Sequence, residues 1–235
     1  MAVGSVKGVD PSFVADAVGI AALTDPVRLA LYRFVVDQPG PVSRDHAAAG
    51  VGVPRHQARF HLERLVADGL LATGHARLTG RTGPGAGRPA TVYRRAPREF
   101  AVTLPDREYE LAGRLLADAV AESARTGMPV LDAVNSAFAA HGAMAARQAV
   151  PTADDPLDAT AQVLAGQGYE PLRDRDEVQL RNCPFHALAQ AQTELICHAN
   201  LCLVAAVADE VGDDRVVARL DPRPDRCCVV VESAP

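Results

Sequence analysis

Three residue types are scarce or unevenly placed in this sequence: tryptophan is absent, lysine occurs once, and no cysteine precedes position 183. No apolar run approaches the roughly 20 residues that cross a bilayer, and residues 1–10 lack the apolar segment of a secretory signal. A membrane-spanning protein and a secreted protein held by disulfide bonds are therefore not expected. We therefore expect a cytoplasmic chain, and in that reducing compartment clustered cysteines more often bind metal or carry out redox chemistry than form disulfides.

Arginine is the basic residue of this chain, and the arginines are unevenly distributed. Between Arg44 and Arg98 there are ten arginines and only three acidic residues, although the whole chain has a net charge of -5. The excess of acidic residues lies in residues 101–235. Arginine can recognise phosphate or guanine through two hydrogen bonds at once, which makes the basic region a candidate for contact with nucleic acid. A solvated basic face is the alternative that charge alone leaves open.

The first hundred residues carry the capping and turn residues of several short helices. Helical spacing of apolar residues predicts two amphipathic helices, at 12–23 and 24–40. Ser43 can cap a short helix, and Pro54 lies near the start of a longer one at 53–69. A short helix, a tight turn and a longer helix have the spacing of a helix-turn-helix motif.

The exposed residues of the longer helix are candidates for DNA contact. Its apolar residues, such as Ala58 and Leu62, share one face, and polar residues occupy the other. A glycine-rich loop between two strand-like segments at 75–92 has the composition of a wing that follows the phosphate backbone or enters the minor groove. From the helices and this loop we predict DNA contacts by Arg44, Arg55, His56, Gln57, Arg59, Arg77, Arg81 and Arg88.

The order of three motifs resembles a family of bacterial regulators. The resemblance is carried by the stretches LTDPVRLALYRFV, FHLERLVADGLL and GAGRPATVYRR. With this order and spacing, residues 15–95 resemble the winged-helix domain of ArsR-like repressors. The resemblance implies that residues 53–68 form the recognition helix and that residues 75–92 form the wing.

Two alanine-rich segments after Pro105 predict long helices, at 106–126 and 128–150. In ArsR-like repressors such helices form the dimer interface, so the resemblance implies a homodimer. A homodimer would match an inverted-repeat operator in double-stranded DNA. The alternative is that these helices cover the winged-helix core within one chain.

The remaining residues alternate between helical and strand-like patterns. We predict helices at 155–168 and 194–212, a hairpin at 169–185, and strands at 215–221 and 227–232. The predicted fold class is α+β. It comprises an N-terminal winged helix-turn-helix domain (1–100), central dimerisation helices (101–150) and a small C-terminal α+β sensor domain (151–235).

All five cysteines lie in the predicted sensor domain. Cys183, Cys197 and Cys227 belong to three different predicted elements, so their thiols can converge, although their spacing is not that of a zinc ribbon. Cys202 lies on another face of its helix and is expected to pack as a small hydrophobic residue. Cys227 and Cys228 alternate along the predicted strand, so only one of them is expected to reach a shared site.

A winged helix followed by three spaced cysteines resembles the SufR-type iron-sulfur repressors. The resemblance implies an iron-sulfur cluster on Cys183, Cys197 and Cys227, and soft thiolates also suit zinc as the alternative. His186, one helical turn after Cys183, is the preferred fourth ligand, and Cys228 or a small molecule are the others considered. A metal-free thiol switch, inert buried thiols and a pocket for a small organic effector are the remaining alternatives.

The sequence does not contain a set of residues typical of an enzyme active site. Cys183 and His186 could act as nucleophile and base, but no oxyanion-type glycine loop or pair of carboxylates accompanies them. The stretch GRTGPGAGRP lacks the lysine and the strand-to-helix context of a phosphate-binding loop. We therefore predict a regulator and not an enzyme.

Overall fold

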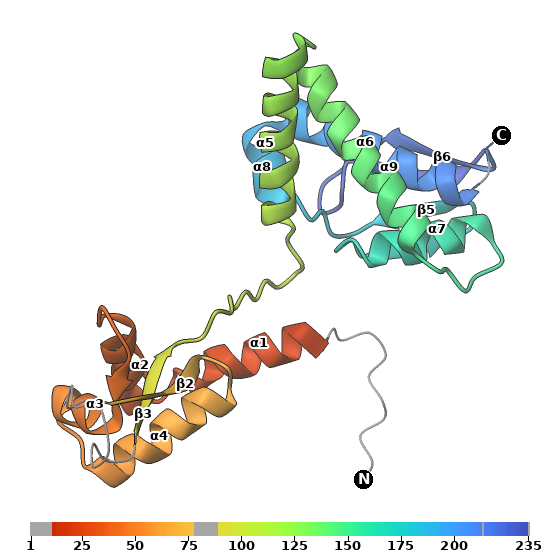
Figure 1. Ribbon diagram of the computed structural model, residues 1–235. Helices are drawn as coiled ribbons and strands as arrows, with labels where there is room; N and C mark the ends of the chain where they lie inside the picture. The colour runs from red at the N-terminus through yellow and green to blue at the C-terminus, as the bar shows by residue number, and fades with distance from the viewer. Residues whose placement is uncertain (1–10, 78–88, 213, 235) are drawn as a thin grey trace, which may run out of the picture. The chain divides into compact units, whose positions relative to one another are not determined.

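The computed structural model describes residues 11–77, 89–212 and 214–234 (Figure 1). The chain forms two compact units, Met1–Val102 and Thr103–Pro235, each with its own hydrophobic core. Both units combine helices with an antiparallel sheet. The predicted α+β class is therefore confirmed.

Within its described residues, the first unit packs four helices around a small three-stranded sheet. Its helices are α1 (Pro11–Ala22), α2 (Pro26–Val36), α3 (Arg44–Val51) and α4 (Arg55–Ala67). Its strands are β1 (Val42–Ser43), β2 (Leu71–Ala76) and β3 (Ala90–Arg95), in the antiparallel order β1-β3-β2. Leu31, Leu62 and Leu65 are fully buried between these elements. This is the arrangement of a winged helix, with β2 and β3 as the strands of the wing.

Local capping explains where the helices of this unit begin and end. The Asp25 carboxylate accepts hydrogen bonds from the backbone N–H groups of Val27 and Arg28, both at 2.9 Å, at the start of α2. The Ser43 hydroxyl accepts a bond from the N–H of His46 and caps α3. Gly52 has φ 74°, a left-handed conformation that ends α3 and turns the chain toward α4. The predicted helix-turn-helix is therefore present.

In the part of the second unit that the structure describes there are five helices and a four-stranded sheet. Its helices are α5 (Tyr109–Thr126), α6 (Val130–Gln148), α7 (Pro156–Ala165), α8 (His186–Ala191) and α9 (Thr193–Gly212). Its strands are β4 (Pro171–Asp174), β5 (Glu177–Leu180), β6 (Val216–Leu220) and β7 (Val229–Ser233). They pair antiparallel in the order β4-β5-β7-β6. The largest buried cluster of this unit includes Phe138, Leu180 and Leu203.

The helices predicted as a separate region at 101–150 belong to this second unit. Helix α6 packs along α9 and against α5 (Figure 1). A Cβ atom at Gly142 would lie 2.2 Å from the carbonyl oxygen of Leu203, so glycine is required where α6 crosses α9. The structure divides the chain into two units near residue 102, and these helices share a hydrophobic core with residues 151–235.

Among the residues that the structure describes, α9 is the one helix long and apolar enough to cross a membrane. Its Leu203, Val204 and Val207 side chains are fully buried, and it packs against α6, α7 and the sheet. The apolar character of α9 is that of the central helix of a folded core.

Candidate functional site

The exposed face of α4 carries the residues predicted to read DNA. Ala58, Leu62 and Leu65 are completely buried on the inner face. The side chains predicted to contact DNA lie outside this stripe: Arg55, His56 and Arg59 are exposed, and Gln57 is partly buried. Helix α4 therefore has one face for the core and one that is free to enter a groove of DNA.

The arginines of this face are paired only weakly with acidic neighbours. The Arg55 Nε atom lies 3.3 Å from a carboxylate oxygen of Asp45, which also pairs with Arg44 at 3.6 Å. Arg59 and Glu63 form a pair at 3.3 Å. All of these groups are well exposed, and such pairs contribute at most about 1 kcal/mol. The guanidinium groups can therefore exchange these partners for phosphates at little cost.

Only part of the predicted wing can be assigned a position. Arg77 follows β2 and is exposed. Arg81 and Arg88 lie outside the described residues. Arg44 and Arg59 line a groove of about 590 Å³ whose other walls include Thr73 and Tyr93 from the wing strands. The strands of the wing and the recognition helix thus form one continuous surface.

Four of the five cysteines come together in the second unit. Cys183 lies in the loop after β5, Cys197 lies in α9, and Cys227 and Cys228 directly precede β7. Cys227 forms hydrogen bonds with the thiols of both Cys183 and Cys228. Cys228 also forms one with Cys197. Three segments that are distant in sequence therefore bring four sulfur atoms into one group, which we call the four-thiol site.

The hydrogen bonds favour a thiolate at the centre of the four-thiol site. The pKa of Cys227 is far below its ordinary value, because the thiol of Cys183, and then that of Cys228, donates to its sulfur. Burial opposes this effect, since Cys227 is only 1% exposed. The pKa values of Cys183 and Cys228 are raised, first by their hydrogen bonds to Cys227 and then by burial. The hydrogen bonds therefore favour a negative charge on Cys227 over one on Cys183 or Cys228.

A buried asparagine, which the sequence analysis did not single out, orients Cys227. The Nδ2 atom of Asn200 in α9 donates to the Cys227 sulfur at 3.2 Å. The hydroxyl of Tyr169 donates to Oδ1 of the same amide and so fixes its orientation. Burial raises the pKa of Tyr169, which keeps this hydroxyl a donor. No sequence motif marked Asn200, because it is a single amide within an apolar helix.

The structure separates the other candidate ligands from the four-thiol site. Cys202 forms no hydrogen bond with the four thiols, and burial alone raises its pKa. His186 is exposed at the start of α8, and its backbone N–H, not its ring, bonds to the Cys183 carbonyl at 3.1 Å. Within the described ranges, no group of three or more His, Cys, Asp or Glu side chains is arranged so that it could hold a metal ion.

The prediction that Cys227 and Cys228 point to opposite faces of a strand was wrong. The strand begins at Val229, so the alternation of a strand does not apply to the two cysteines before it. The N–H of Cys227 donates to the Leu180 carbonyl at 2.8 Å, and the carbonyl of Cys228 accepts from Asp221 at 2.7 Å. These bonds hold the pair in an irregular segment before the strand, where the thiols of both residues form hydrogen bonds within the site.

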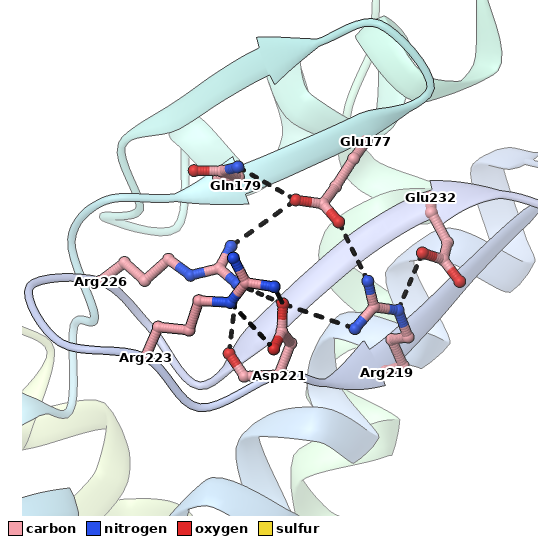
Figure 2. A network of polar contacts seen from close by, with 7 residues as sticks. All are labelled: Glu177, Gln179, Arg219, Asp221, Arg223, Arg226 and Glu232. Carbon is pink, nitrogen blue, oxygen red and sulfur yellow. Dashed lines mark hydrogen bonds and ion pairs between the residues drawn. The ribbon is translucent and has the colours of Figure 1, made fainter.

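A network of ion pairs fixes the loop that leads to Cys227 (Figure 2). Arg226 pairs with Asp221 and lies 3.6 Å from Glu177 of β5. Arg219 of β6 bridges Glu177 at 3.0 Å and Glu232 of β7 at 2.8 Å. Because the Arg226 side chain is only 7% exposed, its contacts with Asp221 and Glu177 are largely shielded from solvent. The network ties three strands to the residue next to Cys227.

The loop of Cys183 is tied to the segment that enters from the first unit. The Arg107 guanidinium donates to Oδ1 of Asn182 and, at 3.1 Å, to the carbonyl of Cys183. Asn182 is buried, and its Nδ2 atom donates to the carbonyl of Asp106 at 2.9 Å. The N–H of Glu108 donates to the Pro184 carbonyl at 3.1 Å. We call these bonds between residues 106–108 and 182–184 the connector clasp.

Comparison with known proteins identifies the first unit. Residues 23–73 match the family model of a helix-turn-helix domain. No curated protein and no solved structure matches the chain. The matched range spans α2, the α3-turn-α4 motif and the beginning of β2. The helix-turn-helix part of the ArsR-like resemblance is thus confirmed, whereas the likeness of the cysteine domain to SufR-type repressors stays a prediction. Through its helix-turn-helix domain the chain is a DNA-binding regulator of transcription.

Proposed function

We propose that the protein is a homodimeric repressor whose C-terminal unit senses redox or iron-sulfur status through the four-thiol site. The observation that carries this proposal is the convergence of Cys183, Cys197, Cys227 and Cys228 around one thiolate. We keep Cys183, Cys197 and Cys227 as the proposed ligands, and of the fourth ligands considered we propose Cys228 in place of His186, because its thiol bonds to both Cys227 and Cys197. An inert role would not require a stabilised negative charge inside an apolar core.

The chemistry of the donor set suits an iron-sulfur cluster, with zinc as the alternative; because the described side chains as they lie here form no metal-binding group, binding would require the thiols to rearrange. Thiolates are the ligands that both prefer, and the site supplies four sulfur atoms from three rigid segments. When bound, an iron-sulfur cluster supplies one-electron redox chemistry and sensitivity to oxidants. The protein's own part is to hold Cys227 deprotonated, to orient it through Asn200, and to fix its loop through Arg226.

A metal-free thiol switch is the second candidate, and the contact between Cys228 and Cys197 favours it. Both residues are partly exposed, so a peroxide could reach them. Oxidation of two thiols to a disulfide transfers two electrons to the peroxide, and the two thiol protons leave with its reduced oxygen atoms. The stabilised thiolate of Cys227 lies beside Cys183 and Cys228 and can exchange with such a disulfide.

Anaerobic purification with iron, sulfide and zinc analysis separates these candidates. We expect a coloured protein with stoichiometric iron and sulfide, or a colourless one with stoichiometric zinc. Titration of free thiols before and after peroxide treatment tests the thiol switch, because formation of a disulfide removes two free thiols. If neither metal is present in stoichiometric amount, the metal site is rejected and the thiol switch becomes the leading function.

The exposed end of the α5–α6 pair supports the proposed homodimer. Val120 of α5 is 57% exposed, and Val130 and Leu131 at the start of α6 are 45% and 58% exposed. Large apolar side chains that gather on one end of a helical pair are typical of a protein interface. A dimer also explains how two recognition helices would read an inverted repeat. Sedimentation of the purified protein measures whether its mass is that of a monomer or of the proposed dimer.

DNA binding is expected to depend steeply on salt. Each phosphate neutralised by arginine contributes about -0.9 to the slope of log affinity against log salt concentration. We expect Arg59→Ala to lower the affinity for a selected inverted-repeat duplex by about five-fold or more and to relax the sequence preference of the protein. The reason is that a paired hydrogen-bond contact from a guanidinium to a base edge contributes about 1–3 kcal/mol of discrimination. Fluorescence anisotropy at several salt concentrations measures both effects.

A matched control for this variant is Arg125→Ala, which removes an exposed arginine from α5 in the other unit. We expect it to leave affinity and salt slope unchanged. Unaltered binding by Arg59→Ala would contradict the assignment of α4 as the recognition helix.

Asn200→Ala is expected to weaken cofactor retention without removing a ligand. Partners that orient a ligand typically contribute 10–100-fold to metal affinity, and Asn200 is the amide that donates to Cys227. We expect metal loss to a chelator to accelerate by about ten-fold or more. Tyr169→Phe keeps the amide but frees its orientation, and a smaller acceleration is expected. Loss rates equal to wild type in both variants would show that the amide has no part in the site.

A further inference from the structure

An aromatic side chain is exposed on the face of α4 that is free to contact DNA. Phe60 is 65% exposed, in a chain of which only 4% of residues are aromatic. It lies four residues after His56 and three before Glu63, so these side chains form one stripe along α4. The stripe lies opposite the buried positions Ala58 and Leu62. Phe60 therefore contributes little to the core.

The residues around Phe60 indicate the chemistry of its binding partner. Its ring packs edge-on against His61, with the centroids 5.2 Å apart, and otherwise faces outward. It lines a groove together with Arg55, His56 and Arg59. A phenyl ring in a groove that holds three arginines and one carboxylate, Glu63, matches a partner that is anionic but offers an apolar group within reach. An acidic protein surface offers the charge, but the fold directs this helix at DNA.

We propose that Phe60 reads thymine through the C5 methyl group in the major groove. That methyl is the one apolar group that the base edges present in this groove, and phenylalanine is among the side chains that contact it. Arg55 and Arg59 then provide contacts to guanine or phosphate on either side. This inference rests on the proposed sequence-specific binding and assigns part of that specificity to one residue.

Thymine-to-uracil substitution tests the proposal, because it removes only the methyl group. Duplexes are first selected from a randomised library with the wild-type protein, and each thymine is then replaced in turn. We expect one position in each half-site at which uracil lowers wild-type affinity about four-fold, the value of one buried methyl group. Phe60→Ala is expected to bind the thymine and uracil duplexes equally.

Three further measurements make the outcome decisive. Phe60→Leu keeps an apolar contact and should retain part of the discrimination. Val18→Ala removes another exposed apolar side chain, from α1, and should retain all of it. Thermal unfolding of Phe60→Ala should match wild type, since the ring is exposed. Discrimination that persists in Phe60→Ala, or that is absent at every position in wild type, overturns this inference. Absence of binding to any duplex would instead reject the proposed function.

Discussion

Cys227→Ser is expected to reduce bound iron and sulfide, or zinc, by at least about ten-fold relative to wild type. Cys227 is the thiolate that the other donors of the site stabilise, and it is almost completely buried. A hydroxyl is a hard donor that stays protonated at neutral pH, so it replaces a thiolate poorly at a soft metal. Metal and sulfide analysis of the anaerobically purified variant measures the loss.

The remaining cysteines and His186 provide the comparison set for this prediction. Cys183→Ser and Cys197→Ser should also lose most of the cofactor, whereas Cys202→Ser should retain it, because Cys202 lies apart from the site. Cys228→Ser and His186→Ala decide the fourth ligand, and we expect only the former to change the absorption spectrum. Full retention by Cys227→Ser, in a variant that unfolds cooperatively, would refute the four-thiol site as the cofactor site.

The parts of the fold that could be predicted from sequence are those determined by neighbouring residues. Ser43 caps α3 through a bond to a residue three positions away, and Gly52 ends the same helix through its own backbone conformation. Both signals can be recognised in the sequence without any knowledge of distant residues. The helix-turn-helix and its exposed arginines followed from such local rules. Phe60 was overlooked because an apolar residue in a helix is normally assigned to the core.

The parts that could not be predicted depend on contacts across the chain. The helical pattern of α5 extends back to Asp106, but the helix begins at Tyr109 because residues 106–108 are bound to the Cys183 loop. The final strand was expected to start at Cys227, but it starts at Val229, and the N–H of Cys227 is bound to the carbonyl of the distant Leu180. Cys228 therefore joins the site, which no rule of strand alternation would allow. Asn200 reaches Cys227 only because α9 crosses behind β7.

The connector clasp is the route by which we expect the four-thiol site to influence DNA binding. At its other end, the connector is anchored on α1: Asp16 accepts bonds from Arg98 at 2.6 Å and from the N–H of Ala101 at 3.2 Å. The ring of Phe100 covers Gly19 of the same helix. From Ala101 to Asp106 the chain can span at most about 18 Å when fully extended. A rearrangement of the Cys183 loop therefore acts on a short tether.

Arg107→Ala is expected to uncouple the two units. In wild type, operator affinity should differ about five-fold or more between the cofactor-loaded and cofactor-free protein, or between oxidised and reduced protein if the site is a thiol switch. Arg107 holds the Cys183 carbonyl and Asn182 to the connector, so its loss should bring this ratio close to one. Affinity in the cofactor-free or reduced state should stay within about two-fold of wild type, because no DNA-contacting residue is changed. Anisotropy titrations at one salt concentration measure all four affinities.

Two variants distinguish coupling from simple damage to the site. Arg114→Ala removes an exposed arginine from α5 and should keep the wild-type ratio. Insertion of Gly-Ser-Gly between Thr103 and Leu104 leaves every bond of the clasp intact but makes the tether longer and flexible, so it should also lower the ratio. A lowered ratio in both Arg107→Ala and the insertion variant, with cofactor content unchanged, identifies the connector as the mechanical link. A wild-type ratio in both variants would mean that the signal bypasses this segment. The clasp would then be broken in one variant, and the tether lengthened in the other, without any effect on the ratio.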